Sequence, residues 1–85
     1  YGLINKVVPK EKLMETARET AKKIAANAPL AVQAAKEMAV RSREMDRTTG
    51  LRCERVINRM LQCTEEAKEG PAAFAEKRPP NFKGR

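Results

Sequence analysis

Apolar residues recur at every third or fourth position through much of this 85-residue chain. From Lys10 to about Asn27 they lie four, four and three residues apart, at Leu13, Ala17, Ala21 and Ile24. This spacing places them in one stripe along a helix, with charged residues on the remaining surface. The repeat therefore predicts an amphipathic helix from Lys10 to about Asn27.

A second helix is predicted to begin at Pro29, because proline is tolerated only in the first turn of a helix. Its apolar residues form two adjacent rows: Leu30, Ala34 and Met38, and Ala31, Ala35 and Ala39. So wide an apolar surface, built largely from small residues, indicates packing on more than one side. We expect this helix to be among the most buried, with more covered surface than an isolated chain of this length easily supplies.

A third helix is predicted from Arg47 to about Cys63, with Asp46 as its N-cap. Gly50 lies inside it and costs about 1 kcal/mol relative to alanine, which we interpret as the close approach of another backbone. The apolar side of this helix consists of Leu51, Cys53, Ile57, Met60 and Leu61.

A short last helix is predicted from Glu65, capped by Thr64 and carrying two acids in its first turn. Pro71 interrupts it, and we expect a kink or a restart there because proline removes a helical hydrogen bond. The Pro79-Pro80 pair ends the helix, and the remaining residues are expected to run out extended.

Two of the three aromatic residues of the chain lie in this last part, beside its densest positive charge. Phe74 and Lys77 are three positions apart and are predicted to share one helix face. A flat apolar ring beside a cation suits a heteroaromatic ligand that carries a phosphate, such as a nucleotide. The alternative is that Phe74 fills the helix core while Lys77 is solvated.

The stretch from Gly2 to Pro9 differs from the rest, since Ile4, Val7 and Val8 favour a short β-strand. A single strand needs a partner for its hydrogen bonds, and no later segment offers one. We therefore expect residues 1–9 to be the end of a core whose sheet lies upstream, and residues 10–85 to form a helical domain.

The formal net charge is +7, from 18 Lys and Arg against 11 Asp and Glu. This balance fits a nucleic acid, a phosphorylated cofactor or an acidic protein surface as partner, and it also fits a solvated basic surface. The basic residues are spread over all the predicted helices instead of forming one stripe, so a nucleic-acid-binding module is the less favoured reading.

Catalytic and metal-binding groups are scarce. The chain has no histidine, no Ser-His or Cys-His pair and no Gly-rich phosphate loop, so we expect neither a catalytic residue nor a metal site. Cys53 and Cys63 fall in one predicted helix, where ten residues span roughly 15 Å and cannot form a disulfide. Free thiols indicate a reducing compartment, and no apolar run is long enough for a membrane span.

Three motifs resemble the C-terminal segments of the crotonase superfamily, the enoyl-CoA hydratase/isomerase enzymes. They are "GLINKVVP", "IAANAPLAVQAAKEM" and "EGPAAFAEKRPPNFKGR", and they cover essentially the whole chain in the family's order. The corresponding family patterns are Gly-Leu-Val-Asn-x-Val-Val-Pro, then Pro-x-Ala-x-x-x-x-Lys, then Glu-Gly-x-x-Ala-Phe-x-Glu-Lys-Arg-x-Pro-x-Phe.

This resemblance implies a fold class: the small, all-α C-terminal trimerisation region of a crotonase fold. It would consist of three amphipathic helices and a short Pro-kinked helix, preceded by one orphan strand. In the family an N-terminal core of ββα units carries two catalytic glutamates and an oxyanion hole, and none of these groups lies in the 85 residues. The resemblance therefore implies a homotrimer, or a dimer of trimers, for the full-length enzyme and an inactive fragment here.

The resemblance also implies a substrate and a site. Phe74 and Lys77 match the family residues that contact coenzyme A near its adenine and ribose phosphate, so the partner is an acyl-CoA thioester and no cofactor is tightly bound. The expected reaction is syn hydration of a trans-2-enoyl-CoA in fatty-acid β-oxidation, with an isomerase or another acyl-CoA lyase as the alternative. The expected location is the cytoplasm, or the mitochondrial matrix of a eukaryote.

Overall fold

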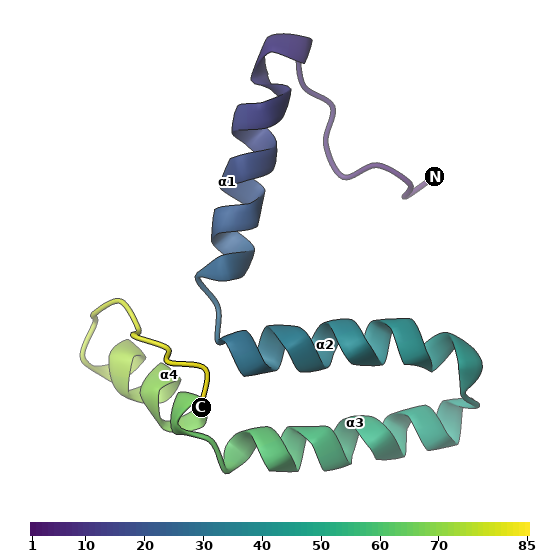
Figure 1. The fold of residues 1–85 in the computed structure, drawn as a ribbon, viewed down its shortest axis with the longest axis vertical. Coiled ribbons are helices and arrows are strands. Elements are labelled where there is room, and N and C mark those ends of the chain that lie inside the picture. Colours follow the sequence, from purple (N-terminus) through teal and green to yellow (C-terminus); the bar gives the residue numbers. More distant parts are fainter.

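The computed structural model describes residues 1–85, and all of its regular elements are helices, in agreement with the predicted all-α class. Its four α-helices are joined by short connections, and two 3-10 turns, η1 (Lys10–Lys12) and η2 (Ser42–Glu44), precede α1 and follow α2 (Figure 1). The helices are α1 (Leu13–Ala25), α2 (Pro29–Arg41), α3 (Arg47–Gln62) and α4 (Glu65–Ala75).

The strand expected at Gly2 to Val8 is not formed, because residues 1–9 have neither helical nor strand structure. The physical reason is that a strand needs a second strand to bond its amide and carbonyl groups. The rest of this chain consists of helices and their connections, so it supplies none. The expectation of an orphan strand is therefore wrong for this chain, although its apolar residues remain uncovered, with Leu3 and Val7 both exposed.

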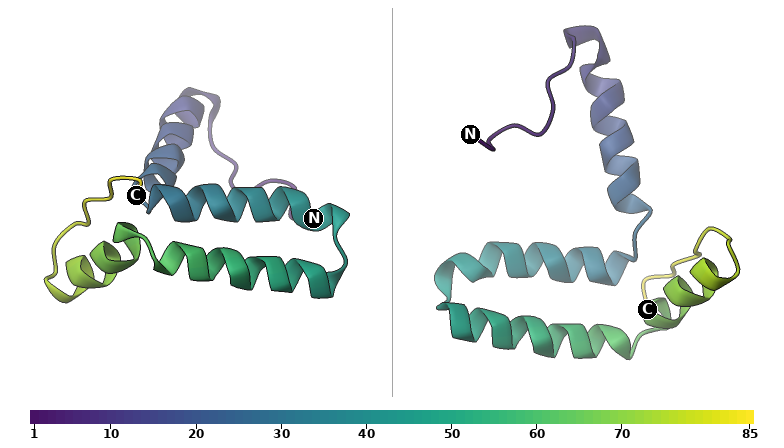
Figure 2. Two further views of the ribbon diagram at one scale, coloured as in Figure 1. Left: turned by 60° about the horizontal axis from the view of Figure 1, so that its bottom comes forward. Right: turned by 180° about the vertical axis from the view of Figure 1, so that it is seen from behind.

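α1 extends away from the other three helices, in all three views of the ribbon (Figures 1 and 2). It begins three residues later than predicted, after η1, and ends at Ala25 instead of Asn27. The side-chain amide of Asn27 donates through Nδ2 to the carbonyls of Lys23 (2.8 Å) and Ile24 (3.2 Å), which satisfies part of the helix end. The predicted apolar stripe exists but is uncovered, since Leu13 and Ile24 are 56% and 53% exposed.

α2 and α3 form an antiparallel pair (Figure 1). Pro29 begins α2, as predicted. The half-buried residues between the two helices include Leu30, Ala34 and Met38 from α2 and Cys53, Ile57 and Leu61 from α3. The second predicted row of α2, Ala31, Ala35 and Ala39, is exposed, and no residue of α2 is fully buried. The expected packing on more than one side is therefore not formed within this chain.

The start of α3 confirms one prediction and contradicts another. Asp46 is the N-cap: its carboxylate accepts hydrogen bonds from the Thr49 amide (3.0 Å) and the Thr49 hydroxyl (2.5 Å), and these bonds lower the pKa of Asp46. Gly50, however, has nothing within 4 Å of the position that a β-carbon would occupy. The close approach of another backbone at Gly50 is therefore absent from this chain.

α4 runs without interruption from Glu65 to Ala75, so the predicted restart at Pro71 is wrong. The clash that normally keeps the residue before proline out of a helix involves that residue's β-carbon, and Gly70 has none. Thr64 occupies the N-cap position, but its hydroxyl donates to the carbonyl of Leu61 (2.6 Å) and makes no cap bond to α4. It closes the end of α3 instead.

The molecule is open and has almost no core. Only Ala73 and Glu66 are buried, and the radius of gyration is 16.2 Å, against about 12 Å for a compact domain of this length. The accessible surface is 7956 Å², whereas a compact 9.5 kDa monomer would expose about 5,000 Å². The helices thus keep their apolar faces largely exposed. None of them combines the length and the apolar character needed to cross a membrane.

Candidate functional site

The end of α4 is a tight turn centred on Lys77. The Lys77 amide donates to the carbonyl of Phe74 (3.2 Å), and the Arg78 amide donates to the carbonyl of Ala73 (3.0 Å). With a left-handed backbone at Lys77 (φ 53°), these two bonds make a Schellman motif. Glycine is usual at this position, because a side chain in the left-handed conformation costs roughly 1 to 2 kcal/mol.

Phe74 and Lys77 do not share a helix face, contrary to the prediction from their spacing. α4 ends at Ala75, so Lys77 lies beyond the last helical turn. Both residues are exposed, and Phe74 is 87% exposed, so its ring does not fill a core within this chain. The turn nevertheless presents an uncovered ring and an uncovered ammonium group on residues whose backbones are hydrogen-bonded to each other.

The residues after this turn fold back along α4. We call residues 78–85 the return segment; in Figures 1 and 2 it reverses direction after α4, and the C-terminus lies near the start of that helix. Three glutamates on one side of α4, which we call the glutamate face, each bind it: Glu65, Glu66 and Glu69. Carboxylates that lie close in the sequence thus become the docking surface for the end of the chain.

Glu69 makes the most contacts of the three. Its Oε1 and Oε2 accept from the two terminal nitrogens of Arg78, at 2.6 and 3.1 Å, and its Oε1 also accepts from the Asn81 amide at 2.7 Å. These bonds, the Arg78 contact foremost, lower the pKa of Glu69 to about 2. Glu69 in turn raises the pKa of Arg78, and Glu76 adds to the effect through a bond to Nε at 2.5 Å.

Glu66 connects three segments of the chain. It is 6% exposed, and no cation pairs with it; its Oε1 accepts from the Gly84 amide (3.0 Å) and its Oε2 from the Leu30 amide (3.1 Å). Leu30 has the first free N–H of α2, since Pro29 has none and the N-cap residue Ala28 has no side-chain acceptor. Glu66 therefore caps α2 from 36 residues away and holds the end of the return segment.

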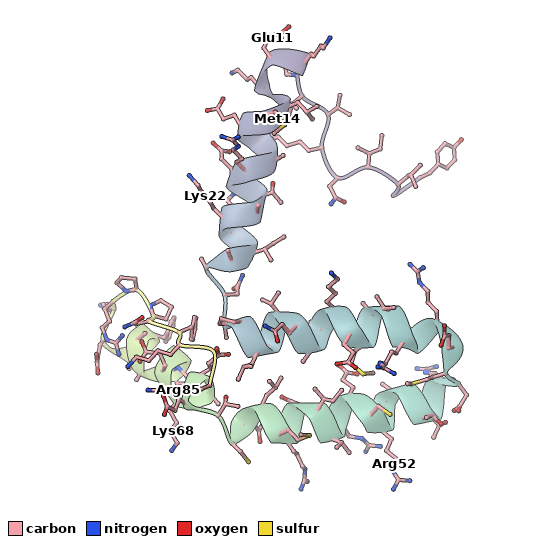
Figure 3. All side chains as sticks on the ribbon, viewed as in Figure 1. Glu11, Met14, Lys22, Arg52, Lys68 and Arg85 are labelled. Atoms are coloured by element: carbon pink, nitrogen blue, oxygen red, sulfur yellow. The ribbon has the colours of Figure 1, made fainter.

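Phe82, the other C-terminal aromatic residue, is half-buried where the return segment meets α4. Arg85, at the end of the segment, places its Nε 3.0 Å from Oε2 of Glu65, against the first turn of α4 (Figure 3). A shallow hollow follows this seam and is lined by Glu65, Glu66, Lys68, Glu69, Ala72, Asn81, Phe82 and Lys83. The three carboxylates of this hollow are already bonded to the return segment. Phe82 is half-buried at the same seam, so its ring packs the return segment against α4.

Phe74 and Lys77 offer an apolar ring and a cation to a ligand, an arrangement that suits binding. No group of three or more His, Cys, Asp or Glu side chains is arranged to hold a metal ion. Sequence reasoning identified Phe74 and Lys77, but it treated Glu66 as an ordinary helix-start acid and gave Glu69 no role of its own. The available signal was the spacing of the glutamate face, i, i+1 and i+4, followed within twenty residues by Arg78 and Arg85.

The family model for enoyl-CoA hydratase/isomerase matches residues 1–85. The chain is 43% identical over 84 residues to 2,3-dehydroadipyl-CoA hydratase of Escherichia coli and to (E)-benzylidenesuccinyl-CoA hydratase of Thauera aromatica. It is 44% identical over 89 residues to carnitinyl-CoA dehydratase of Salmonella typhi. These alignments cover 99 to 100% of the chain, and the chain spans about one third of the length of the curated relatives.

Solved structures agree with the sequence relatives. Enoyl-CoA hydratase of Bacillus anthracis superimposes with a TM-score of 0.94 at 44% identity, covering 100% of this chain and 33% of that protein. An enoyl-CoA hydratase/isomerase of Mycobacterium abscessus gives 0.93 at 40% identity, covering 100% and 35%. The open helical arrangement is therefore one that occurs inside larger proteins of this kind. By its sequence and its fold, the chain belongs to the enoyl-CoA hydratase/isomerase family.

Proposed function

We propose that these 85 residues are the C-terminal helical segment of a longer enoyl-CoA hydratase. The support is the fraction of each relative that the chain spans, together with apolar helix faces that find no cover within it. In this proposal residues 1–9 adjoin the catalytic core, and residues 10–85 form the domain through which subunits associate as a trimer. The catalytic groups lie outside the chain, so the 85 residues alone do not hydrate an enoyl thioester.

The proposed reaction is hydration of a double bond conjugated to a coenzyme A thioester. Two of the relatives are named hydratases and a third a dehydratase, and dehydration is hydration run in reverse. In this proposal the catalytic groups lie outside the chain, and its contribution is to bind the part of the substrate that does not react.

Phe74 and Lys77 are the proposed contacts to the nucleotide end of coenzyme A. The observation that carries this assignment is the exposed ring and exposed ammonium at one hydrogen-bonded turn. A ring can stack on adenine, and an ammonium forms charge-assisted hydrogen bonds with phosphate oxygens. The left-handed backbone of Lys77 fits this role, because strained residues persist at binding sites where the surroundings hold them.

Replacing Lys77 with glutamate in the complete enzyme tests the assignment. A charge-assisted contact to phosphate contributes about 1.5 to 3 kcal/mol, so Lys77→Glu should raise the KM for crotonyl-CoA by about one to two orders of magnitude. The kcat should change little, because a contact to the non-reacting nucleotide is equal in the ground and transition states. Steady-state kinetics with crotonyl-CoA measures both constants.

Crotonyl-pantetheine, which lacks the nucleotide, is the decisive second substrate. Lys77→Glu should leave its kcat/KM unchanged, whereas an equal loss on both substrates would show that Lys77 acts on the structure and not on coenzyme A. Lys22→Glu is the matched control: it makes the same charge change on α1, away from α4 (Figure 3), and should affect neither substrate.

A further inference from the structure

The turn at Lys77 is strained and depends on what holds the chain on its far side. The two Schellman hydrogen bonds tie the turn to α4 on its N-terminal side. On its C-terminal side the turn continues directly into the return segment, which begins at Arg78. If that segment were free, the left-handed conformation would compete with unstrained alternatives that move the Lys77 side chain. The contacts of Arg78 and of the residues after it therefore decide where the ammonium group lies.

The contacts of Arg78 and Asn81, the bonded residues nearest the turn, meet at one carboxylate, Glu69. Glu69 lies two turns before the end of α4, and it accepts both terminal nitrogens of Arg78 and the amide of Asn81. A bidentate pair fixes the guanidinium in plane as well as in distance, and the bond to Asn81 fixes the backbone three residues further on. The chain from Lys77 to Asn81 is thus closed into a loop across a single side chain of α4.

We propose that Glu69 is a positioning residue for coenzyme A binding: through Arg78 and the Asn81 amide, its carboxylate holds Lys77 in the turn that presents its ammonium to the nucleotide phosphate. This inference rests on the proposed role of Lys77 and adds the residue that sets its geometry. Glu69 itself contacts no substrate.

The other acids near the return segment do not fit this role. Glu65 binds Arg85 at the far end of the segment, in a pair whose side chains are 66% and 64% exposed. Glu66 binds the Gly84 amide, also at the far end. Glu76 reaches the same guanidinium as Glu69 but is 61% exposed and has no bond to the rest of the segment. The Glu69 side chain is 22% exposed and is the only one that joins both Arg78 and Asn81.

Glu69→Gln in the complete enzyme is the test, because it removes the charge while keeping the shape. The KM for crotonyl-CoA should rise about threefold, a value set by the modest strength of partly exposed ion pairs. The kcat should stay within about twofold, and crotonyl-pantetheine should be unaffected, since only the nucleotide contact is disturbed. Glu76→Gln is the matched control, which removes a carboxylate from Arg78 without touching Asn81, and it should leave the KM unchanged.

A second variant and a second readout keep the test independent of one substitution. Arg78→Lys retains the positive charge but loses the bidentate fork, so it should raise the KM to a similar extent. Hydrogen exchange at the Asn81 amide, followed without substrate, should be faster in Glu69→Gln than in Glu76→Gln, because only Glu69 accepts that hydrogen bond.

The outcomes separate the two proposals. A raised KM in Lys77→Glu with an unchanged KM in Glu69→Gln and Arg78→Lys would overturn the positioning role alone, even if Asn81 exchanged faster. A KM unchanged in all three variants would remove the coenzyme A contact and the positioning role together. Equal losses on crotonyl-CoA and crotonyl-pantetheine in Glu69→Gln would show that Glu69 stabilises the enzyme in general, which also overturns the positioning role.

Discussion

Glu69 and Glu66 lie on the same helix, but their carboxylates have different kinds of partner. Glu69 remains partly exposed and pairs with the guanidinium of Arg78, so its charged form is favoured by a cation and by hydrogen bonds. Glu66 is buried without a cation, and its two oxygens are satisfied by backbone amides of Leu30 and Gly84. Both arrangements depend on residues that are distant in the sequence. Neither glutamate can therefore be told apart from the other helix acids by its neighbouring residues in the sequence.

The contact between Glu69 and the return segment should depend on pH. The pKa of Glu69 falls from an ordinary 4.5 to about 2 in the folded state. A depressed carboxyl pKa stabilises the docked segment fully above the unfolded value, and this contribution is lost as the pH falls from about 4.5 toward about 2. In the complete enzyme, the amide resonance of Asn81, followed by NMR through an acid titration, should therefore shift mainly as the pH approaches about 2.

Glu69→Gln is the control for this titration, because the other acids near the segment, Glu65, Glu66 and Glu76, remain. The shift of Asn81 below pH 4.5 should disappear in that variant. A wild-type Asn81 resonance that is constant down to pH 2, or one that moves equally in both proteins, would contradict the assigned contact.

At the scale of the elements, α2 is a helix whose N-terminal cap comes from another helix. Ala28 supplies no side-chain acceptor and Pro29 supplies no donor, so the free amide of Leu30 relies on Glu66 of α4. The same carboxylate binds the Gly84 amide, so the cap of α2 and the docking of the chain end are coupled through one side chain.

Removing this carboxylate should weaken the start of α2. Glu66→Ala leaves the Leu30 and Gly84 amides without their acceptor, and the loss of a cap of this kind costs about 1 to 2 kcal/mol. Hydrogen exchange at Leu30 in the folded protein should then be roughly five- to thirtyfold faster. Glu65→Ala, one residue earlier and bonded only to Arg85, should leave Leu30 unchanged; equal acceleration in both variants would show that Glu66 is not the cap.

At the scale of the whole molecule, good helices are combined with almost no core. Ala73 is the only buried hydrophobic residue, while Leu13, Met14, Ile24 and Phe74 are all more than half exposed. Figure 3 shows the side chains of α1, Met14 and Lys22 among them, with no other helix beside them. Burial of apolar surface is the main force that makes folding cooperative, and here each helix buries little against its neighbours.

The isolated 85-residue chain should therefore not unfold cooperatively. We expect partial helicity in far-UV circular dichroism, a broad thermal transition and poorly dispersed amide resonances, because the surfaces that would order the helices are uncovered. A sharp thermal transition that is independent of protein concentration would contradict this expectation. A transition that sharpens as concentration rises would instead show that copies of the chain cover one another.

Local signals in the sequence determined the helices and most of their ends. Proline at Pro29 and the carboxylate of Asp46 act on amides within a few residues of themselves, so their effects are confirmed without knowledge of the fold. The apolar repeats likewise assigned the amphipathic faces of α1, α2 and α3, and the motifs placed the chain in its family. The same reasoning singled out Phe74 and Lys77 but placed them on one helix face, whereas Lys77 lies in the turn after α4.

Contacts between distant segments were decided only by the tertiary structure. Whether Gly50 lay against another backbone depended on a neighbouring segment that this chain does not provide. The cap of α2 by Glu66 and the clamp of the return segment by Glu69 join residues 36 and 12 positions apart. Hydrophobic periodicity records which face of a helix is apolar, but not which amide a carboxylate meets, because that meeting is set by how the chain turns back on itself.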